Sequence, residues 1–332
     1  MNMKSVFIVW YSYSQRAKTL AAELEGQISF QYEAGLKGLW LTPLRYLIQG
    51  WKTWRFLERE RPEIVLVQTP PIFAAMTVAL WCRLCGKTRN SERRACYVID
   101  AHTATFHHHD WRWALPLVRF LSQRAVVTLV TDEVALGMLH DWNAKGLFLT
   151  DGLPNLCPPY GLIGSDGANR VAVISVFSDN EPIEEVFDAA RLLPEVTFYL
   201  TGNPELAPSQ LLAQKPDNVV LTGFLRDGKY SALLKNVHGL VVLTKQPNDL
   251  SCAAYEGLAM AKPIVSSNGP EMRRFFTRGI IFVKNTPESI ADGIKQMLNE
   301  QGRLTQEVIA MRSVLEAKRQ PNFEKFISLF QR

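Results

Sequence analysis

Residues 240–268 read LVVLTKQPNDLSCAAYEGLAMAKPIVSSN. Two apolar runs, Leu240–Thr244 and Pro263–Ser267, have the length and the β-branched character of buried strands, and a helical pattern over residues 251–261 separates them. A strand, a helix and a second strand in this order form a βαβ unit, whose two strands are parallel. The segment therefore predicts a doubly wound α/β fold in this part of the chain.

The same alternation extends over the whole chain. Further strands are predicted at Val6–Trp10, Ile64–Gln68, Tyr97–Asp100, Val126–Thr131, Leu147–Thr150, Val171–Val176, Val196–Thr201, Val219–Thr222 and Ile280–Val283. A Gly- and Pro-rich stretch interrupts the alternation, and we place a linker there, at residues 156–169. We therefore predict two Rossmann-like domains with doubly wound parallel sheets, at residues 1–155 and 170–320, and a helix at 321–332 that crosses back to the first domain. Such sheets bind ligands at the carboxyl ends of their strands, so we expect the domains to face a cleft.

The composition supports two folded domains. Of 332 residues, 47% are hydrophobic and 21% charged, with 5 Cys. These values exclude a disordered chain, a collagen and a disulfide-stapled miniprotein. Residues 1–160 hold 18 Lys and Arg against 13 Asp and Glu, whereas residues 161–332 hold 19 of each, and all eight Trp lie in the first 142 residues. A basic, Trp-rich half predicts a nucleic-acid partner or an anionic membrane surface.

Cysteine spacing and apolar runs bear on the compartment. The five cysteines have no regular spacing, which indicates a reducing compartment. No signal-peptide pattern is visible, and the longest apolar stretch, Ile72–Cys82, is about half of a membrane span. We therefore expect a cytoplasmic protein that is soluble or peripheral on the cytoplasmic membrane face.

Residues 39–61 combine aromatic and cationic side chains. At 100° per residue, one helical arc holds Leu44, Leu47, Ile48, Trp51 and Trp54, with Arg45 and Lys52 at its border. This arc fits a helix that packs on the sheet. It also fits an interfacial helix that docks on anionic lipid and faces a lipid-linked acceptor, because Trp40 and its aromatic neighbours exceed what the packing needs. Trp40, Trp51 and Trp54 are the candidate membrane residues.

The turn and helix at residues 248–256 carry the strongest candidate site. The chain has neither a P-loop nor Gly-x-Gly-x-x-Gly after its first strand, which argues against ATP hydrolysis and hydride transfer. Free amides near Leu250 can instead cradle a diphosphate. Glu256 lies about two turns further on, where a carboxylate can accept hydrogen bonds from two ribose hydroxyls. An ordinary surface glutamate on a βαβ helix is the alternative.

Residues 255–265, YEGLAMAKPIV, resemble the hallmark segment of the donor domain in GT-B, family-4-like glycosyltransferases. The spacing of Thr201-Gly-Asn203, Leu221–Leu225 and Leu243-Thr244 is similar to that domain as well. The resemblance implies a nucleotide-sugar donor, with its base near Gly223–Arg226 and its ribose on Glu256. The donor-binding residues implied in this way are Gly202, Asn203, Gly223, Phe224, Leu225, Lys245, Asn248, Asp249, Leu250, Ser251 and Glu256.

Two positions depart from the family pattern. The family has a second Glu eight residues before Glu256, where this chain has Asn248. The usual Arg and Lys after the first strand of the donor domain are replaced by Ser178–Pro182. The diphosphate charge is then left to Lys245, to helix amides or to another cation, and a retaining outcome does not follow from the motif.

In the first half, Val67–Pro71 and Val98–His102 are similar to segments of the β-mannosyltransferases that extend lipid-linked chitobiose. Asp100 and His102 end a predicted strand at the cleft edge. Either side chain can act as general base on an acceptor hydroxyl, position the donor diphosphate or hydrogen-bond the strand end.

Other polar positions of this half receive weaker assignments. Pro70 begins a turn after a predicted strand. The amides of this turn either bind an acceptor, or the turn is only a rigid connection. Ser14 and Arg16 are assigned to the acceptor side together with Pro70. His107–Asp110 carries three adjacent histidines, which converge poorly on one ion, so we expect no metal.

The sequence thus predicts a GT-B hexosyltransferase that uses a UDP- or GDP-sugar and a lipid-linked saccharide acceptor at a membrane face, in polysaccharide or glycolipid synthesis. We expect no cofactor, no metal and no nucleic acid. The alternatives are an inactive GT-B scaffold that partners another transferase, favoured by the missing family residues, and a nucleotide-sugar epimerase.

Overall fold

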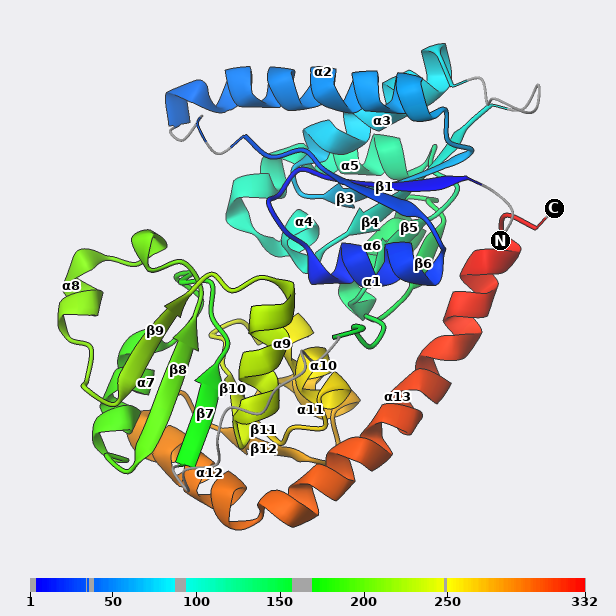
Figure 1. Cartoon of the computed structure of the whole chain (residues 1–332). Coiled ribbons are helices and arrows are strands. Elements are labelled where there is room, and N and C mark those ends of the chain that lie inside the picture. The colour runs from blue at the N-terminus through cyan, green and yellow to red at the C-terminus, as the bar shows by residue number, and fades with distance from the viewer. Residues whose placement is uncertain are drawn as a thin grey trace. The chain divides into compact units, whose positions relative to one another are not determined.

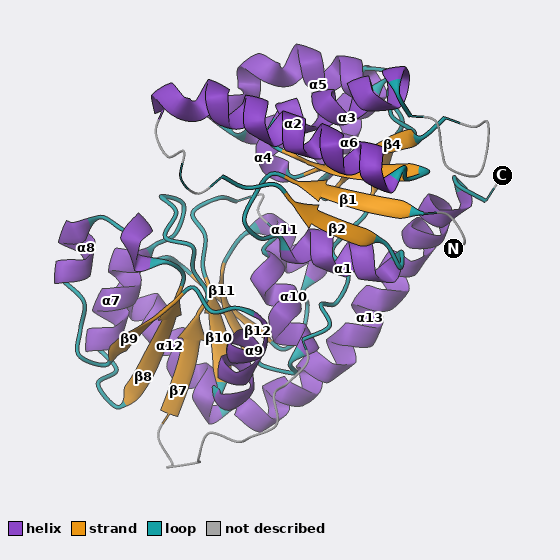
Figure 2. Cartoon of the chain, turned by 45° about the horizontal axis from the view of Figure 1, so that its top comes forward, coloured by secondary structure: helices purple, strands orange, loops and turns teal. Residues whose placement is uncertain are grey.

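The computed structural model describes residues 4–33, 35, 39–86, 94–156, 169–247 and 250–331 (Figure 1). The chain divides into two compact units. Unit 1 comprises Met1–Gly152 and Arg319–Arg332, and unit 2 comprises Leu153–Lys318. Most of the linker expected at residues 156–169 lies outside the described residues. In each unit, strands form one layer with helices on both sides (Figure 2).

Unit 1 contains a six-stranded sheet in the order β2-β1-β3-β4-β5-β6, with every neighbouring pair parallel. Its strands are β1 (Ser5–Val9), β2 (Gln27–Phe30), β3 (Ile64–Thr69), β4 (Cys96–Ala101), β5 (Thr128–Val130) and β6 (Gly146–Phe148). Its helices are α1 (Gln15–Glu23), η1 (Leu39–Leu41), α2 (Thr42–Glu60), α3 (Ile72–Leu84), α4 (Thr103–His107), η2 (His109–Ala114), α5 (Leu115–Ser122) and α6 (Glu133–Asp141). Strands β1 and β3 are buried at every residue, as strands covered on both faces are.

Two apolar cores form on the two faces of this sheet. Side chains of α2, α3, α5 and α6 pack on one face, against Val6, Ile8, Val65 and Val67. On the other face, α1 and the end of α13 (Gln301–Ser328) pack against Phe7, Val9 and Leu66. Alternate residues of one strand therefore serve different cores, which is the two-residue period of a strand.

Unit 2 contains a second six-stranded parallel sheet, in the order β12-β11-β10-β7-β8-β9. Its strands are β7 (Asn169–Val173), β8 (Val196–Thr201), β9 (Val219–Gly223), β10 (Gly239–Val242), β11 (Ile264–Ser267) and β12 (Ile280–Val283). Its helices are α7 (Ile183–Arg191), η3 (Pro204–Leu206), α8 (Ser209–Ala213), α9 (Asp227–Asn236), α10 (Cys252–Ala259), α11 (Pro270–Phe275), α12 (Pro287–Asn299) and the first part of α13. The predicted class, α/β with two doubly wound parallel sheets, is confirmed.

Several elements differ from the sequence-based expectation, among them one strand and two helices. Strand β2 was not predicted, because it is short, lies at the sheet edge and has an exposed first residue. The short helix α4 directly after β4 was not predicted either. Helix α13 continues through Pro321, where the pattern predicted a break.

The continuity of α13 has a packing explanation. An interior proline costs a helix about 3 kcal/mol. Phe326 and Phe330 beyond it are buried in the core of unit 1, and full burial of such a side chain contributes about 1.5–3 kcal/mol. The two burials together offset the proline. Among the described residues, no helix is both long enough and apolar enough to cross a membrane.

Candidate functional site

The strand orders locate the ligand-binding edge of each unit. In a doubly wound sheet, ligands bind beyond the carboxyl ends of the strands where the strand order reverses. In unit 2 this switch point lies between β7 and β10, and in unit 1 it lies between β1 and β3. The loops after these four strands are therefore the expected location of a ligand-binding site in each unit.

In unit 2, Glu256 is a buried carboxylate on α10, close to the switch point. The hydroxyl of Tyr230, on α9, donates a hydrogen bond to its Oε2. A buried carboxylate with a hydroxyl donor is already adapted to accept hydrogen bonds from hydroxyl groups, such as those of a ribose. Glu256 is therefore not the ordinary surface glutamate of the alternative interpretation.

Other residues of the YEGLAMAKPIV segment have structural roles. Tyr255 is buried and meets the Phe276 ring edge-on. The Lys262 ammonium group donates hydrogen bonds to the carbonyls of Lys235 and Val237 at the end of α9, each at 2.7 Å, and burial lowers its pKa.

Glu181 occupies the loop after β7, where the expected basic pair is missing. Its carboxylate accepts hydrogen bonds from the Ser175 hydroxyl at 2.6 Å and from the backbone N–H groups of Val176 at 3.1 Å and Ser178 at 3.3 Å. Successive backbone N–H groups in such a loop form an anion-binding concavity. Here a carboxylate of the chain itself fills it.

Lys245 is exposed and lines a cavity of about 200 Å³ at this switch point. The other charged side chains of the lining are acidic: Asp179, Glu181 and Glu184. The Lys245 backbone N–H donates to the Asn180 carbonyl at 2.6 Å, which joins the loops after β7 and β10. Lys245 is therefore the one cationic side chain among the described residues that line this cavity.

The start of α10 is described only in part. Asn248 and Asp249 lie outside the described residues. Leu250 is half-buried, and Ser251 is the N-cap of α10 but makes no side-chain capping bond. The Ser251 hydroxyl therefore does not occupy the first amide N–H groups of α10. Amide groups at the start of a helix are the ones that can bind a phosphate.

The glycines expected on the donor side allow tight turns after β8 and β9. Gly202 has φ +101°, and a Cβ there would lie 2.6 Å from the Ser175 carbonyl oxygen, so only glycine fits. Gly223 has φ +70° and leads into the exposed Phe224, whose ring lies beneath the Arg226 guanidinium. Asn203 caps η3 by accepting from Glu205 N–H at 3.2 Å, and Leu225 is half-buried. The exposed Phe224 ring is a surface on which a planar group can stack.

In unit 1, Arg16 is the centre of a buried ionic cluster at the carboxyl ends of the strands. Its Nε donates to both carboxylate oxygens of Asp100, at 2.9 and 3.1 Å, and its Nη1 donates to Asp151. Burial opposes the charge on Arg16, but the two carboxylates hold its pKa above the ordinary value. Asp100 is fully buried and already paired, so its geometry is that of a positioning group rather than of a general base.

His102 follows β4 and is half-buried beside this cluster. Its Nε2 lies 3.8 Å from Asp100 Oδ2, and its backbone N–H donates to the Thr69 carbonyl at 3.0 Å. Burial lowers the pKa of His102, although Asp100 acts in the opposite direction. A neutral imidazole that faces a carboxylate has the form of a general base.

The remaining acceptor-side residues are built into the framework. The Ser14 hydroxyl caps α1 by accepting from Ala17 N–H at 3.2 Å, which fixes the turn that carries Arg16. Pro70 is buried between β3 and α3, so its ring is not a contact surface. Both residues position the site and do not line it.

The Trp-rich segment forms η1 and α2, and its tryptophans differ in exposure. Trp40 is 96% exposed and Trp51 is 60% exposed, whereas Trp54 is half-buried against the core. Trp54 therefore fits the packing interpretation of the arc, and the membrane interpretation stays a prediction. Further exposed apolar side chains lie on the neighbouring helices, and together they form what we call the outer face: Leu44, Leu47, Trp51, Met76, Leu80, Leu84, Trp113 and Phe120.

The histidine loop brings possible metal ligands closer than the sequence suggested. Ligand atoms of His108, His109 and Asp110 lie within 4.8 Å of one another, so adjacent histidines do converge here. His109 and Asp110 are exposed, and in the part of the chain that the structure describes this is the one such group.

Sequence inspection missed three residues of these sites: Asp151, Tyr230 and Glu181. Asp151 follows β6 at the same sheet edge as Asp100, so the rule that singled out Asp100 could have found it. Tyr230 and Glu181 carry no such signal, because their roles depend on the folding of α9 and of the loop after β7.

Comparison with known proteins gives a family-model match within the second half of the chain and a fold for the whole. Residues 164–312 match the family model of glycosyl transferases group 1. No curated protein matches the chain.

Solved structures are similar over nearly the full length. The chain is 14% identical to Anabaena Alr3699/HepE in complex with UDP and glucose (TM-score 0.70, covering 98% of this chain and 100% of that chain). It is 12% identical to sucrose-phosphate synthase from Thermosynechococcus elongatus (TM-score 0.68, 98% and 99%) and 11% identical to a putative UDP-N-acetylglucosamine 2-epimerase from Listeria monocytogenes (TM-score 0.62, 98% and 98%). These similarities establish the GT-B architecture of two Rossmann-like domains. The similarity of Val67–Pro71 and Val98–His102 to the chitobiose β-mannosyltransferases stays a prediction.

Proposed function

We propose that this GT-B glycosyltransferase, with its group 1 domain in unit 2, moves a sugar from a UDP- or GDP-sugar to a hydroxyl of a lipid-linked saccharide. The reaction would take place at the cytoplasmic face of a membrane, in polysaccharide or glycolipid synthesis. Unit 2 would bind the donor, and unit 1 would bind the acceptor.

The observation that carries the donor assignment is the buried Glu256 carboxylate with its hydroxyl donor, Tyr230. In the proposal, the two ribose hydroxyls replace or join the Tyr230 hydroxyl on Glu256. The base stacks on Phe224, and the first amides of α10 and Lys245 meet the leaving diphosphate. UDP and UDP-glucose are bound in the similar HepE structures, which supports a nucleotide-sugar donor.

On the acceptor side, His102 is the proposed general base. A proton on Nε2 faces the Asp100 carboxylate, which leaves the Nδ1 lone pair to accept a proton from the acceptor hydroxyl. Arg16 holds Asp100 in place, and Asp100 Oδ2 lies 3.8 Å from Nε2, which is beyond hydrogen-bond distance, so in the proposal the carboxylate favours this tautomer through its charge. The proposed mechanism requires no metal and no cofactor.

The membrane assignment is supported by the outer face of unit 1. Eight large apolar side chains are exposed there, with Arg45, Lys52 and Arg55 on the same α2 helix. Exposed apolar side chains among cations suit the boundary of an anionic bilayer, where a lipid-linked acceptor resides.

A thermal-shift panel of UDP, GDP, CMP, dTDP and ADP sugars tests the donor assignment. We expect one UDP- or GDP-sugar to raise the melting temperature of the wild type and to have no effect on Glu256→Gln. The proposal would be contradicted if no sugar of the panel raised the melting temperature, or if Glu256→Gln showed the same increase as the wild type.

One observation favours a second candidate, the inactive scaffold. Glu181 fills the amide concavity at the switch point, and acidic side chains dominate the cavity there. A scaffold predicts no response to the panel. An epimerase, as in the putative Listeria UDP-N-acetylglucosamine 2-epimerase, would instead convert its donor with no acceptor present.

A further inference from the structure

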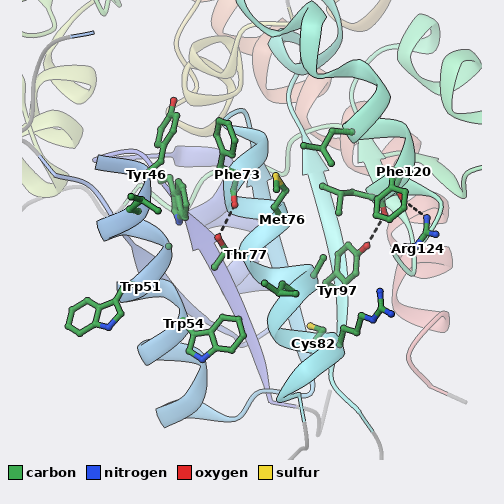
Figure 3. A pocket seen from close by; sticks show the side chains of 18 of the residues that line it. Tyr46, Trp51, Trp54, Phe73, Met76, Thr77, Cys82, Tyr97, Phe120 and Arg124 are labelled. Atoms are coloured by element: carbon green, nitrogen blue, oxygen red, sulfur yellow. Dashed lines mark hydrogen bonds between the residues drawn. The ribbon is translucent and has the colours of Figure 1, made fainter. Parts of the chain in front are cut away.

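A wide groove lies on the outer face of unit 1, along α3 and between α2 and α5 (Figure 3). We call it the α3 groove. Its volume is about 1,310 Å³, which exceeds the roughly 300–1,000 Å³ of ordinary small-molecule pockets. Figure 3 shows Tyr46, Trp54 and Phe73 in the strip between α2 and α3, and Phe120 and Tyr97 on the other side of α3.

The walls of the groove are apolar even where their residues carry polar atoms. The Trp10 indole N–H donates to the Thr53 hydroxyl at 2.9 Å, and the Tyr97 hydroxyl donates to the Leu121 carbonyl at 2.8 Å. The Thr77 hydroxyl donates to the Phe73 carbonyl at 2.9 Å. With these donors engaged inside the protein, the groove presents mainly hydrocarbon to an occupant.

The groove connects the two edges of the sheet of unit 1. At one end it is lined by Trp10, which directly follows β1, and by Phe73 in the first turn of α3. The carboxyl ends of β1 and β3 lie at this edge, as does His102 after β4. At the other end it is lined by Cys96, where β4 begins. Helix α3, with 13 residues, spans about 20 Å between the two ends.

Cations gather at the end away from His102. Of the described residues that line the groove, three are arginines, namely Arg83, Arg94 and Arg124, and one, Asp110, is acidic. Arg94 Nη1 donates to the Arg83 carbonyl at 2.9 Å, and the Arg124 guanidinium lies 3.6 Å from the centre of the Phe120 ring. All three arginines are exposed, so they can meet anionic headgroups.

We infer that the α3 groove binds the hydrocarbon chain of the lipid-linked acceptor. The chain would leave the saccharide and its phosphate at the His102 edge, pass Trp10 and Phe73, and run along α3 to the arginines. There it would enter a bilayer whose anionic headgroups the arginines contact. The inference rests on the proposed function, because it gives the lipid part of that acceptor a binding site of its own.

A hydrocarbon chain fits the groove better than a peptide does. An extended peptide needs partners for its backbone N–H and C=O groups, and the wall groups named above are already engaged. A lipid chain needs only apolar contact along its length. The arginine-rich end also matches an anionic lipid, whereas a second copy of this basic outer face would bring like charges together.

Binding of farnesyl diphosphate to the full chain, measured by isothermal titration calorimetry, tests the inference. Ala79→Trp fills the groove from α3, and Met76→Asp places a charge in its wall. We expect each variant to weaken binding of farnesyl diphosphate at least about tenfold. Met76 is 38% exposed, so Met76→Asp keeps the test decisive if Ala79→Trp fails to fold.

Two matched variants serve as controls. Val134→Asp adds the same charge as Met76→Asp at an exposed apolar position of α6, outside the residues that line the groove. Ala22→Trp adds the same indole at an exposed position of α1, on the opposite face of the sheet. Both should bind farnesyl diphosphate like the wild type. Inorganic diphosphate should bind far more weakly than farnesyl diphosphate, and equally to all variants.

Three results would overturn the inference. The first is wild-type binding of farnesyl diphosphate no tighter than that of inorganic diphosphate. The second is unchanged farnesyl diphosphate binding in both groove variants, even if they lose binding to phosphatidylglycerol vesicles. The third is a wild-type dimer in sedimentation that Met76→Asp dissociates, which would assign the groove to contacts between copies.

The nucleotide-sugar panel separates this inference from the proposed function. Farnesyl diphosphate binding that depends on the groove, with no response to any nucleotide sugar, would leave the groove assignment standing and remove the donor assignment. A donor response that depends on Glu256, without groove-dependent binding of farnesyl diphosphate, would do the reverse.

Discussion

Units 1 and 2 have the same architecture but treat charge at their ligand-binding edges in different ways. In unit 1, two carboxylates pair inside the protein with one buried arginine, Arg16. In unit 2, Glu181 accepts hydrogen bonds from a hydroxyl and from backbone amides, and Glu256 accepts one from a hydroxyl. The fold thus provides equivalent positions, and the side chains decide how a carboxylate at such a position is held.

Removing the buried cation should produce the largest effect. Arg16→Met removes the buried cation that pairs with Asp100 and Asp151, and we expect a loss of about 3–5 kcal/mol in the free energy of unfolding of unit 1. Urea denaturation measures this loss. Arg303→Met, which removes an exposed cation paired with Glu300 and Glu307, should have no measurable effect. Equal losses in the two variants would refute the role of Arg16.

Replacing the proposed base should affect turnover and spare the donor. His102→Asn is expected to lower kcat by about 10²–10⁴-fold. The affinity for the nucleotide sugar should stay within about threefold of the wild type, because unit 2 holds the donor. Single-turnover kinetics and calorimetry provide the two measurements. A parallel fall of both would place His102 in the donor site instead.

Replacing Glu256, which is proposed to bind the ribose, should instead lower the affinity for the donor. Glu256→Ala removes a charged acceptor of hydroxyl hydrogen bonds, and we expect donor affinity to fall by about 10–100-fold. Tyr230→Phe removes the internal donor and keeps the carboxylate, so its donor affinity should equal or exceed that of the wild type. Weaker donor binding in Tyr230→Phe than in Glu256→Ala would show that Tyr230 is the ligand-binding group.

The outer face of unit 1 should govern binding to vesicles. Leu47→Glu combined with Trp51→Glu places two charges among its exposed apolar side chains, and we expect about tenfold weaker binding to phosphatidylglycerol vesicles. Val134→Glu combined with Leu206→Glu adds the same charge at exposed apolar positions elsewhere and serves as the control. Equal losses of vesicle binding in the two double variants would show that net charge alone explains the effect.

The lowered pKa of His102 should produce the smallest effect, on the pH profile. An ordinary histidine with a pKa of about 6.5 is only about one quarter neutral at pH 6. Since burial lowers the pKa of His102, turnover at pH 6 should exceed that fraction of its plateau value. The unfolded chain binds more protons than the folded one just below pH 6.5, so stability should also fall as the pH falls through this range. An acid limb of kcat above pH 6.5 would contradict the environment described for His102.

Most of the fold could be predicted from the sequence, because buried parallel strands are short apolar runs. Strand β2 was not predicted, because an edge strand does not need apolar residues on both faces. The separate helix expected from residue 321 is instead the end of α13, because tertiary packing of Phe326 and Phe330 prevails over the local effect of Pro321. Elements that depend on a few long-range contacts are the ones that local patterns miss.

The candidate sites were predictable where position along a strand fixes the location. Asp100 and His102 follow from the end of β4, and Glu256 follows from its place on α10. The pairing of Asp100 with Arg16 could not be foreseen, because 84 residues separate the two. The filling of the loop after β7 by Glu181 was equally hidden, since it depends on backbone conformation, including φ +58° at Phe177.

Amide hydrogen exchange with and without the nucleotide sugar that the panel identifies tests the division between the units most directly. If unit 2 binds the donor, exchange should slow at residues 250–256, where α10 begins and Glu256 lies, and should be unchanged along α2 and α3 of unit 1. Protection confined to unit 1, or absent from residues 250–256, would contradict the account.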